Sequence, residues 1–171
     1  MDCLLEYSRI NTRSEPFAIV DMGILIRDVL AQHQDFLNSN NARIELSDYP
    51  TVFGDRRQLS TLLWNLLENA VLYRRDVVPV VKITCSRQGE FWEFSITDNG
   101  IGIEDEHRDD VFTIFKRLGM KKVDGRGIGL AICRRVVARH GGRIWLTSDV
   151  GVGTTFSFTL PVGVEQQNAD G

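Results

Sequence analysis

One stretch of the chain runs Phe91-Trp92-Glu93-Phe94-Ser95-Ile96-Thr97-Asp98-Asn99-Gly100-Ile101-Gly102-Ile103. Large apolar residues occupy every second position from Trp92 to Ile96, so they share one face of a predicted β-strand. Asp98 continues that apolar face and therefore needs a hydrogen-bonding partner, because an unpaired carboxylate in the core would cost several kcal/mol. The stretch predicts a strand that delivers an acidic group into a binding site. Asp98 could instead serve only the turn Asp98-Asn99-Gly100.

Further strands are predicted on both sides of this segment. Residues 80–85 precede it across a turn at residues 87–90, a spacing that predicts a β-hairpin with residues 91–97. Residues 143–148 and 154–160 form a second predicted strand pair across a glycine-containing turn. Most strands are therefore expected in the second half of the chain.

The first half contains a predicted amphipathic helix that begins after Asp21, a good N-cap residue. Its apolar stripe at helical spacing consists of Met22, Leu25, Ile26, Val29, Leu30, Phe36 and Leu37. His33 falls on the same stripe and is interpreted as a core or boundary histidine. A short strand at residues 43–46 is expected to follow.

A second helix is predicted from the capping box formed by Asp55 and Gln58 to about Tyr73. One side of this helix is apolar and consists of Leu59, Leu62, Leu63, Leu66, Leu67 and Ala70. At 100° per residue, Asn65, Glu68 and Asn69 gather on roughly the opposite side. This polar stripe either faces solvent or lines a cleft, where its oxygen atoms could bind a metal.

Residues 104–122 form a charged segment that is interrupted by Phe112 and Phe115. We expect this segment to be a mobile lid, in which Phe112 anchors a short helix to the core. Such a lid would connect the Asp98 loop to the last helix.

Three glycines, Gly125, Gly127 and Gly129, open the last predicted helix, which ends at Gly141-Gly142. A glycine-rich entry to a helix is a ready anion site, because free backbone N–H groups and the helix dipole favour phosphate. The pattern is neither a P-loop nor a dinucleotide-binding fingerprint.

Composition indicates an ordinary soluble domain. A chain of 171 residues is about one domain, and folding at this size buries roughly 70% of the unfolded surface. The apolar fraction of 43% and the charged fraction of 25% are typical of globular proteins. A net charge of -3 gives no electrostatic reason to expect nucleic acid or an anionic membrane as a partner.

Cysteine usage and hydropathy point to the cytoplasm. Cys3, Cys85 and Cys133 are far apart and odd in number, so neither a disulfide framework nor a zinc site is indicated. No apolar run approaches the roughly 18 residues that span a bilayer, and the N-terminus does not begin a signal peptide. The chain is expected to be cytoplasmic, although a longer parent protein could be membrane-anchored.

Four motifs occur in order, at residues 65–70, 98–103, 125–130 and 153–155. Together they resemble the nucleotide-binding boxes of sensor histidine kinases, with the greatest similarity to phytochrome-like kinases. These kinases share an ATPase superfamily with gyrase-type topoisomerases, ninety-kilodalton heat-shock chaperones and mismatch-repair ATPases. Each box alone is a weak signal, whereas all four together are not expected by chance. The resemblance extends over about residues 20–162.

The resemblance implies an α/β (α+β) two-layer sandwich. Its mixed, largely antiparallel sheet would be covered by helices on one face, with ATP between the helices and under a mobile lid. Residues 1–16 would be the end of a dimerisation and phosphoacceptor helix with its linker. Residues 17–163 would form the histidine-kinase-type ATPase domain, and residues 164–171 a disordered tail.

The same resemblance implies ATP and Mg²⁺ as cofactors. Asn69 matches the Mg²⁺ ligand, Asn65 assists at the phosphates or at metal-bound water, and Glu68 completes the catalytic group. Asp98 matches the carboxylate that binds adenine. The other implied cofactor-binding residues are Tyr73, Arg74, Gly100, Gly102, Ile103, Lys116, Gly125, Arg126, Gly127, Ile128, Gly129, Leu130 and Thr155.

Within this set, the resemblance gives Tyr73 the role of an aromatic wall for adenine and gives Gly100 and Gly102 the base pocket. Thr155 holds the hydroxyl position of the last box. Leu72 stands where many kinases place a lysine for phosphate contact. The phosphate charge is therefore left to Arg74, Lys116, Arg117 or Arg126.

Hydrolysing members of the superfamily carry a glutamate four residues before the metal-binding asparagine, where it activates water. This chain has Asn65 there, which favours transfer to another acceptor. None of His33, His107 and His140 stands in the family's phosphoacceptor setting, and His140 sits where a cation would suit a helix end.

The implied partners are therefore a histidine-containing dimerisation domain, on the same parent chain or a partner, and a response regulator. Homodimerisation would occur only through that helical domain, and neither nucleic acid nor direct membrane contact is expected. Two alternatives stay open: a nucleotide-binding regulatory module without transferase activity, and an anti-sigma-type serine kinase or slow ATPase. The isolated chain is expected to bind ATP without autophosphorylating.

Overall fold

The computed structural model describes residues 14–108, 110–112 and 129–162. The strands are β1 (Ala18–Asp21), β2 (Arg43–Glu45), β3 (Thr51–Gly54), β4 (Val80–Gln88), β5 (Phe91–Asp98), β6 (Ile144–Asp149) and β7 (Gly153–Pro161). The helices are α2 (Met22–Gln32), α3 (Gln34–Ser39), α4 (Arg56–Leu72) and α5 (Gly129–Arg139), with the 3-10 turns η1 (Asp105–His107) and η2 (Asp110–Phe112).

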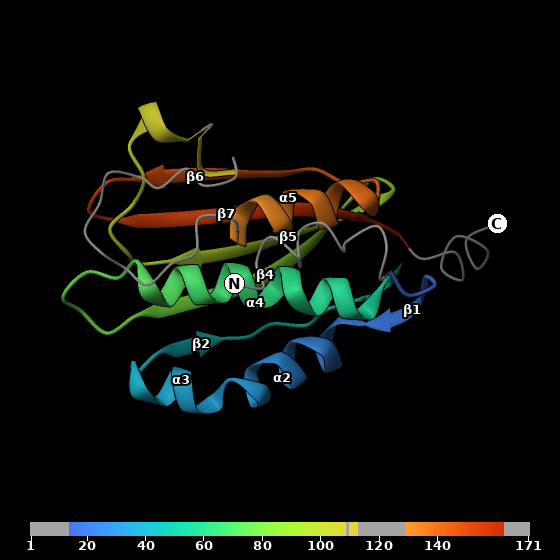
Figure 1. The fold of residues 1–171 in the computed structure, drawn as a ribbon, viewed down its shortest axis with the longest axis horizontal. Helices are drawn as coiled ribbons and strands as arrows, with labels where there is room; N and C mark the ends of the chain where they lie inside the picture. Colours follow the sequence, from blue (N-terminus) through green and yellow to red (C-terminus); the bar gives the residue numbers. More distant parts are fainter. Residues whose placement is uncertain (1–13, 109, 113–128, 163–171) are drawn as a thin grey trace.

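Five strands form one sheet in the order β2-β4-β5-β7-β6. Strand β2 runs parallel to β4, whereas the other three pairings are antiparallel. Helices α4 and α5 lie against one face of this sheet, with α2 beside α4 (Figure 1). The predicted two-layer fold with a mixed, largely antiparallel sheet is confirmed.

The core lies between the helices and the inner face of the sheet. Alternate residues of β4, β5 and β7 point inward and are no more than 5% exposed: Val81, Ile83, Phe94, Ile96, Phe156 and Phe158. The rings of Phe94 and Phe158 stack with centroids 5.2 Å apart. The other face carries polar pairs such as Ser95 with Ser157, as expected for an antiparallel sheet that faces water on one side.

The single helix predicted for residues 22–37 is wrong, because the chain forms α2 and α3 with a break at His33. The His33 ring stacks on Trp64 with centroids 3.5 Å apart, and burial lowers the pKa of this histidine. The apolar stripe continues from α2 into α3, since Phe36 packs against the core and Leu37 is buried. His33 is thus a half-buried boundary residue, as its position on the stripe predicted.

A small second sheet was not predicted. Strands β1 and β3 pair antiparallel, with Val20 opposite Val52, and Val52 also bridges to Val162 beyond the end of β7. The hairpin between β4 and β5 is tighter than expected. Its loop is only Gly89-Glu90, and Gly89 adopts a positive φ of 64°.

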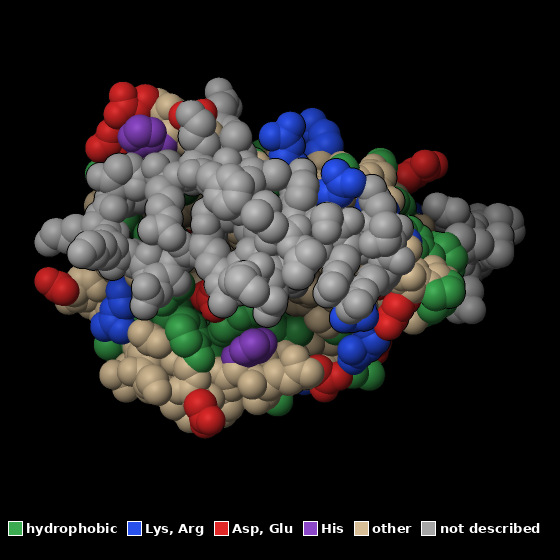
Figure 2. All heavy atoms as spheres, viewed as in Figure 1, with side chains coloured by type: hydrophobic (Ala, Val, Ile, Leu, Met, Phe, Trp, Pro, Cys, Tyr) green, Lys and Arg blue, Asp and Glu red, His purple; other side chains and the backbone are tan. Residues whose placement is uncertain are grey.

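Some predictions lie outside the described residues, namely the helix end at residues 1–13, the lid from residue 113 onward and the tail. Within the described part, acidic side chains gather over η1, whereas Lys and Arg side chains gather along the upper edge near α5 (Figure 2). None of the described helices combines the length and apolar character that crossing a bilayer requires.

A buried charged junction joins the N-terminus of α4 to the C-terminus of α5. The Asp55 side chain, which is fully buried, caps α4 by accepting from the Gln58 N–H at 3.1 Å. It also accepts from the Glu15 N–H at 2.7 Å and pairs with the Arg139 guanidinium at 2.9 Å. Asp55 therefore fastens the entering chain to both helices.

His140 completes this junction as a neutral ring. Its Nε2 accepts the Asp55 N–H at 3.0 Å, and its Nδ1 lies 2.8 Å from the Val136 carbonyl oxygen, to which it donates. Burial is the main cause that lowers the pKa of His140. The Phe17 ring stacks on it at 4.6 Å. The helix end at which a cation would suit the dipole therefore holds a buried, neutral imidazole.

Candidate functional site

Asp98 lies at the end of β5, where its inward face reaches the edge of the core. Its Oδ1 accepts hydrogen bonds from the Gly100 N–H at 2.8 Å and from the Thr154 N–H at 3.1 Å. Its Oδ2 accepts no hydrogen bond from any described residue. The turn interpretation of Asp98 is therefore confirmed for Oδ1, and binding of a ligand by Oδ2 stays a prediction.

The buried environment of Asp98 disfavours its ionised form. Burial raises the pKa of this carboxyl group to about 6, although the hydrogen bonds from Gly100 and Thr154 oppose the shift. A donor from a ligand would replace the water that Oδ2 loses on burial. The group is thus suited to bind an N–H donor such as an exocyclic amine.

Backbone close to Asp98 is packed too tightly for side chains. A Cβ at Gly100 would lie 2.3 Å from the Tyr73 carbonyl oxygen, and a Cβ at Gly102 would lie 2.4 Å from that of Asp149. The Ile101 N–H donates to the Tyr73 oxygen at 3.0 Å, which ties the loop to the end of α4. These glycines therefore place the Asp98 loop between α4 and the β6–β7 turn.

A hydroxyl cluster supports the other side of this loop. The Ser148 Oγ accepts from the Ile103 N–H at 2.8 Å and lies 2.7 Å from the Thr154 Oγ1. Ser148, Thr154 and Ile103 are all buried. The cluster couples the Asp98 loop to both β6 and β7.

The structure does not place the predicted residue Thr155 at this site. Its hydroxyl lies 2.9 Å from that of Thr97 on the outer face of the sheet, whereas Asp98 faces inward. Thr154 faces the site instead, and its N–H binds Asp98 directly. The two-residue alternation through Phe156 and Phe158 could have identified Thr154, because it shares their inward face.

The polar stripe of α4 is half-buried rather than fully solvated. Asn65, Glu68 and Asn69 all have intermediate exposure. Asn65 Nδ2 donates to the Thr61 carbonyl oxygen at 3.0 Å. The Asn69 carboxamide makes no hydrogen bond to a described residue, so its oxygen can bind a ligand. This stripe ends one turn before Tyr73, at the Asp98 loop.

The N-terminus of α5 meets the same stripe. A Cβ at Gly129 would lie 3.1 Å from Asn65 Oδ1, so the first residue of α5 sits against Asn65. No acidic residue occupies the first turn of α5, and Leu130 is half-buried there. A helix N-terminus carries a partial positive charge, so this end of α5 favours an anion beside Asn65.

Arg74 is not directed toward this stripe. Its Nη1 donates to the Asn40 carbonyl oxygen at 3.0 Å, at the C-terminus of α3. This contact holds Arg74 on the side of α4 away from α5, so its prediction as a phosphate contact is not supported. The predicted residues Lys116, Gly125, Arg126, Gly127 and Ile128 lie outside the described residues.

The described residues fit a nucleotide that spans from Asp98 to α5. Asp98 would bind the base, Asn65 and the α5 N-terminus would face the phosphates, and Asn69 offers a neutral oxygen to a metal. An amide oxygen is a hard ligand suited to Mg²⁺ that phosphates already hold. The donor set thus fits a phosphate-bound magnesium ion.

Comparison with known proteins identifies this arrangement. The sequence profile of the family described as histidine kinase-, DNA gyrase B- and HSP90-like ATPases matches residues 54–164. The chain belongs to this ATPase family. Its predicted identity as the ATP-binding catalytic domain of a histidine kinase is confirmed.

Three similar proteins illustrate the match. The phytochrome-like protein Cph1 of Synechocystis is 35% identical over 164 residues, which cover 95% of this chain and 22% of Cph1. The structure of full-length ShkA with AMPPNP has a TM-score of 0.79 at 28% identity, covering 95% of this chain and 35% of ShkA. The structure of the histidine kinase ThkA in complex with the response regulator TrrA has a TM-score of 0.71 at 25% identity. The match covers 88% of this chain and 43% of ThkA. This chain spans less than half of each.

The pKa of Asp98 predicts how ATP binding depends on pH. Because its pKa is raised to about 6, the free protein carries a protonated Asp98 below that pH. Acceptance from an adenine amine requires the ionised form, so ATP affinity should fall as pH drops through 6, by up to about tenfold per pH unit. Calorimetric titrations from pH 8 to pH 5 would measure this loss.

The matched control is Asp98→Asn, which keeps an oxygen acceptor but cannot titrate. Protonation of the ATP phosphates affects both proteins equally. The difference between the two proteins in how steeply ATP affinity falls with pH therefore reports the ionisation of Asp98. Equal slopes for the two proteins would contradict ionisation of Asp98 as the cause.

Proposed function

We propose that this domain binds Mg²⁺·ATP and transfers the γ-phosphoryl group to a histidine on a separate domain. The observation that carries the proposal is the position of three features along α4: the Asn65–Asn69 stripe lies on this helix, the Asp98 loop is bonded to its end at Tyr73, and the first residue of α5 lies against Asn65. In the transfer, the histidine nitrogen bonds to the γ-phosphorus while the bond to the β,γ-bridging oxygen breaks, which releases ADP. Phosphohistidine would then be the donor to a response regulator.

The residues around the phosphates support transfer rather than hydrolysis. Asn65, an amide, cannot serve as a general base that activates water. Asn69 would hold the magnesium ion, and the ion would neutralise phosphate charge during transfer. The α5 N-terminus adds partial positive charge on the other side of the site. Positioning and charge neutralisation are the main requirements of phosphoryl transfer.

None of the described histidines stands in the phosphoacceptor setting of the family. His33 is stacked on Trp64, and His140 is 3% exposed with both ring nitrogens engaged. His107 lies on η1, 3.4 Å from the Glu106 carboxylate. We therefore assign the acceptor to a dimerisation domain, on the parent chain or a partner, through which homodimerisation would also occur.

We assign a response regulator as the subsequent partner. The basis is the solved complex of the similar kinase ThkA with the response regulator TrrA. The regulator would take its phosphoryl group from the phosphohistidine rather than from ATP.

The magnesium assignment predicts a selective effect of Asn69→Ala. The variant should lose most of the gain in ATP affinity that Mg²⁺ provides, because its only change at the site is loss of an oxygen ligand. Calorimetry with Mg²⁺ and with EDTA would separate that gain from metal-free binding. Asn38→Ala on the exposed side of α3 is the control. An unchanged magnesium dependence in Asn69→Ala would place the metal elsewhere.

Incubation with γ-labelled ATP tests the proposed function. The chain alone should acquire no stable label, whereas a supplied histidine-containing dimerisation domain should acquire acid-labile phosphate. Tight ATP binding without any transfer would favour the regulatory module. Phosphoserine on a partner, or steady phosphate release, would favour a serine kinase or slow ATPase. Stoichiometric label on His33, His107 or His140 would contradict an external acceptor.

A further inference from the structure

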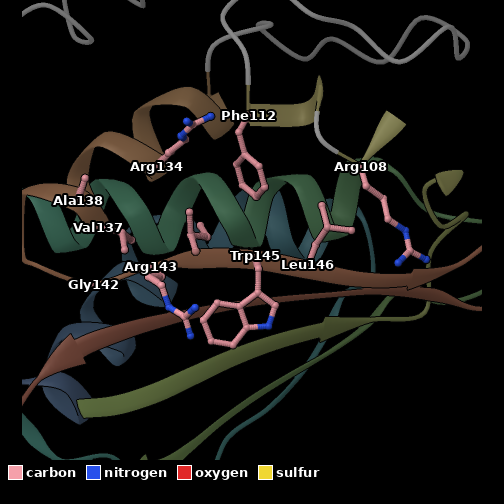
Figure 3. A pocket seen from close by; sticks show the side chains of 10 residues that line it. Arg108, Phe112, Arg134, Val137, Ala138, Gly142, Arg143, Trp145 and Leu146 are labelled. Carbon is pink, nitrogen blue, oxygen red and sulfur yellow. The ribbon is translucent and has the colours of Figure 1, made fainter. Parts of the chain in front are cut away.

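A cavity of about 610 Å³ lies on the outer side of α5, between this helix, β6 and η2. Figure 3 shows Phe112 and Arg134 on the helix side, whereas Trp145 and Arg143 project from the other side of β6. Strand β6 is the last strand of the sheet, so the cavity follows a free sheet edge. None of the residues assigned to the nucleotide lines this cavity.

Backbone groups of β6 point into this cavity. The Thr159 N–H donates to the Arg143 carbonyl oxygen at 2.9 Å, which sets the hydrogen-bonding phase between β6 and β7. In an antiparallel pair, alternate residues turn their N–H and C=O groups away from the partner strand. Ile144 and Leu146 are these residues here. Among the described residues, none hydrogen-bonds to their outward groups.

The next outward group along β6 is already occupied. Arg108 Nη2 donates to the Ser148 carbonyl oxygen, and Arg108 also pairs with Asp105 at 2.9 Å. The free edge therefore ends after Leu146. It spans the three residues Ile144–Leu146, about 10 Å at roughly 3.3 Å per residue, so about three residues of an added strand can pair with it.

The side chains of this edge are unusually apolar. Ile144 and Leu146 pack toward the core side and Trp145 toward the other face, and all three are only half-buried. Natural edge strands are usually protected by charge, proline or a bulge. Strand β2, at the opposite edge, is protected in this way, because exposed Arg43 and Glu45 flank Ile44 in a strand of three residues. The first half of β6 has no such protection.

The charge of the cavity selects the kind of partner. Arg108, Arg134 and Arg143 line it, and none of its described lining residues is acidic. The Arg143 guanidinium lies 5.3 Å from the centre of the Trp145 ring, so a cation and an aromatic surface are presented together. Arg108 is paired with Asp105, but a second copy of this chain would bring a further Arg134 and Arg143 to the same place, which electrostatic repulsion disfavours.

We propose that the β6 edge docks an extended acidic segment of another protein, which adds a strand beside Ile144–Leu146. Main-chain hydrogen bonds to Ile144 and Leu146 would hold the segment, as in other cases of strand addition. Alternate side chains would face opposite sides. Apolar residues would contact Ile144, Leu146 and Phe112, whereas Asp or Glu residues would face Arg143.

A short blocked peptide of alternating glutamate and valine is the probe, and a lysine–valine peptide is its charge-reversed counterpart. The acidic peptide should bind with saturation to the intact chain, and the basic peptide should not. In amide NMR spectra, the largest shifts should occur at Ile144 and Leu146. Trp145 should shift less, because its N–H already faces β7. Absence of saturable binding, equal binding of both peptides, or shifts centred elsewhere would overturn the proposal.

Charge reversal of the cavity provides the matched test. The double variant Arg134→Glu/Arg143→Glu should weaken acidic-peptide binding by roughly tenfold or more. Arg43→Glu, at the opposite sheet edge, should leave it unchanged. ATP affinity should be the same in all three proteins, which shows that the fold and the nucleotide site are intact. Equal peptide binding by the double variant and Arg43→Glu would refute the docking edge.

Discussion

Replacement of Asp98 by alanine is expected to weaken ATP binding by roughly ten- to over a hundred-fold. The physical reason is the loss of a charge-assisted hydrogen bond to the adenine amine, which contributes about 1.5 to 3 kcal/mol. The same change removes the acceptor that holds the Gly100 and Thr154 N–H groups, so the pocket would also lose order. Calorimetric titration of ATP against both proteins measures the effect.

Nucleotide selectivity separates base recognition from this loss of order. The wild type should bind GTP poorly, because guanine presents a carbonyl acceptor where adenine has its amine. Asp98→Asn keeps an oxygen for Gly100 and Thr154 and turns an amide donor toward the base. Its preference for ATP over GTP should therefore shrink. Equal affinity of the wild type for ATP and GTP would defeat the assignment of Asp98 to the base.

Arg139→Met is expected to destabilise the fold by about 3 kcal/mol, because it leaves the Asp55 charge buried without its cation. Asp55 is fully buried, and the Arg139 side chain is only 23% exposed. Arg139 also donates to Gln58 at 2.8 Å, and its guanidinium lies 4.7 Å from the centre of the Phe17 ring. For a domain of this size, the melting temperature should fall by about 10 °C.

The matched control is Arg56→Met, which breaks the ion pair with Asp28 on the surface. Both side chains of that pair are at least half exposed, so its loss should cost under about 1 kcal/mol. Urea unfolding of the two variants and the wild type gives the comparison. Similar losses in the free energy of unfolding for Arg139→Met and Arg56→Met would show that the buried ion pair stabilises the fold no more than the surface ion pair does.

Local patterns were sufficient for the parts of the fold with strong periodicity. The leucines of α4 recur at helical spacing, and β5 alternates strictly, so both elements and the inward position of Asp98 were predictable. The break at His33 was not, because the apolar stripe continues through Phe36. It coincides with a stack on Trp64 from another helix, which no local pattern contains. Strands β1 and β3 have four residues each, too few for a clear alternation.

For the candidate site, the sequence predicted the grouping of Asn65, Glu68 and Asn69 on one side of α4, because these residues are close in sequence. The position of Thr154 relative to Asp98 depends on strand register across 56 residues, and the pairing of Asp55 with Arg139 spans 84. Contacts of this kind arise from the tertiary fold. The contact that turns Arg74 toward Asn40 is of the same type. The positions of the motifs in the sequence could not predict which residue Thr154, Arg139 or Arg74 contacts.

Amide NMR mapping of Mg²⁺·ATP on the isotope-labelled chain tests the central claim most directly, because it locates the bound nucleotide. The largest amide chemical-shift changes should occur at residues 100–103, at Thr154 and at Gly129. They should also occur along α4 from Asn65 to its C-cap, Tyr73. The β6 edge at Ile144–Leu146 should change little. Shifts centred on the 610 Å³ cavity beside β6, or no saturable shifts at all, would contradict a nucleotide site built on Asp98.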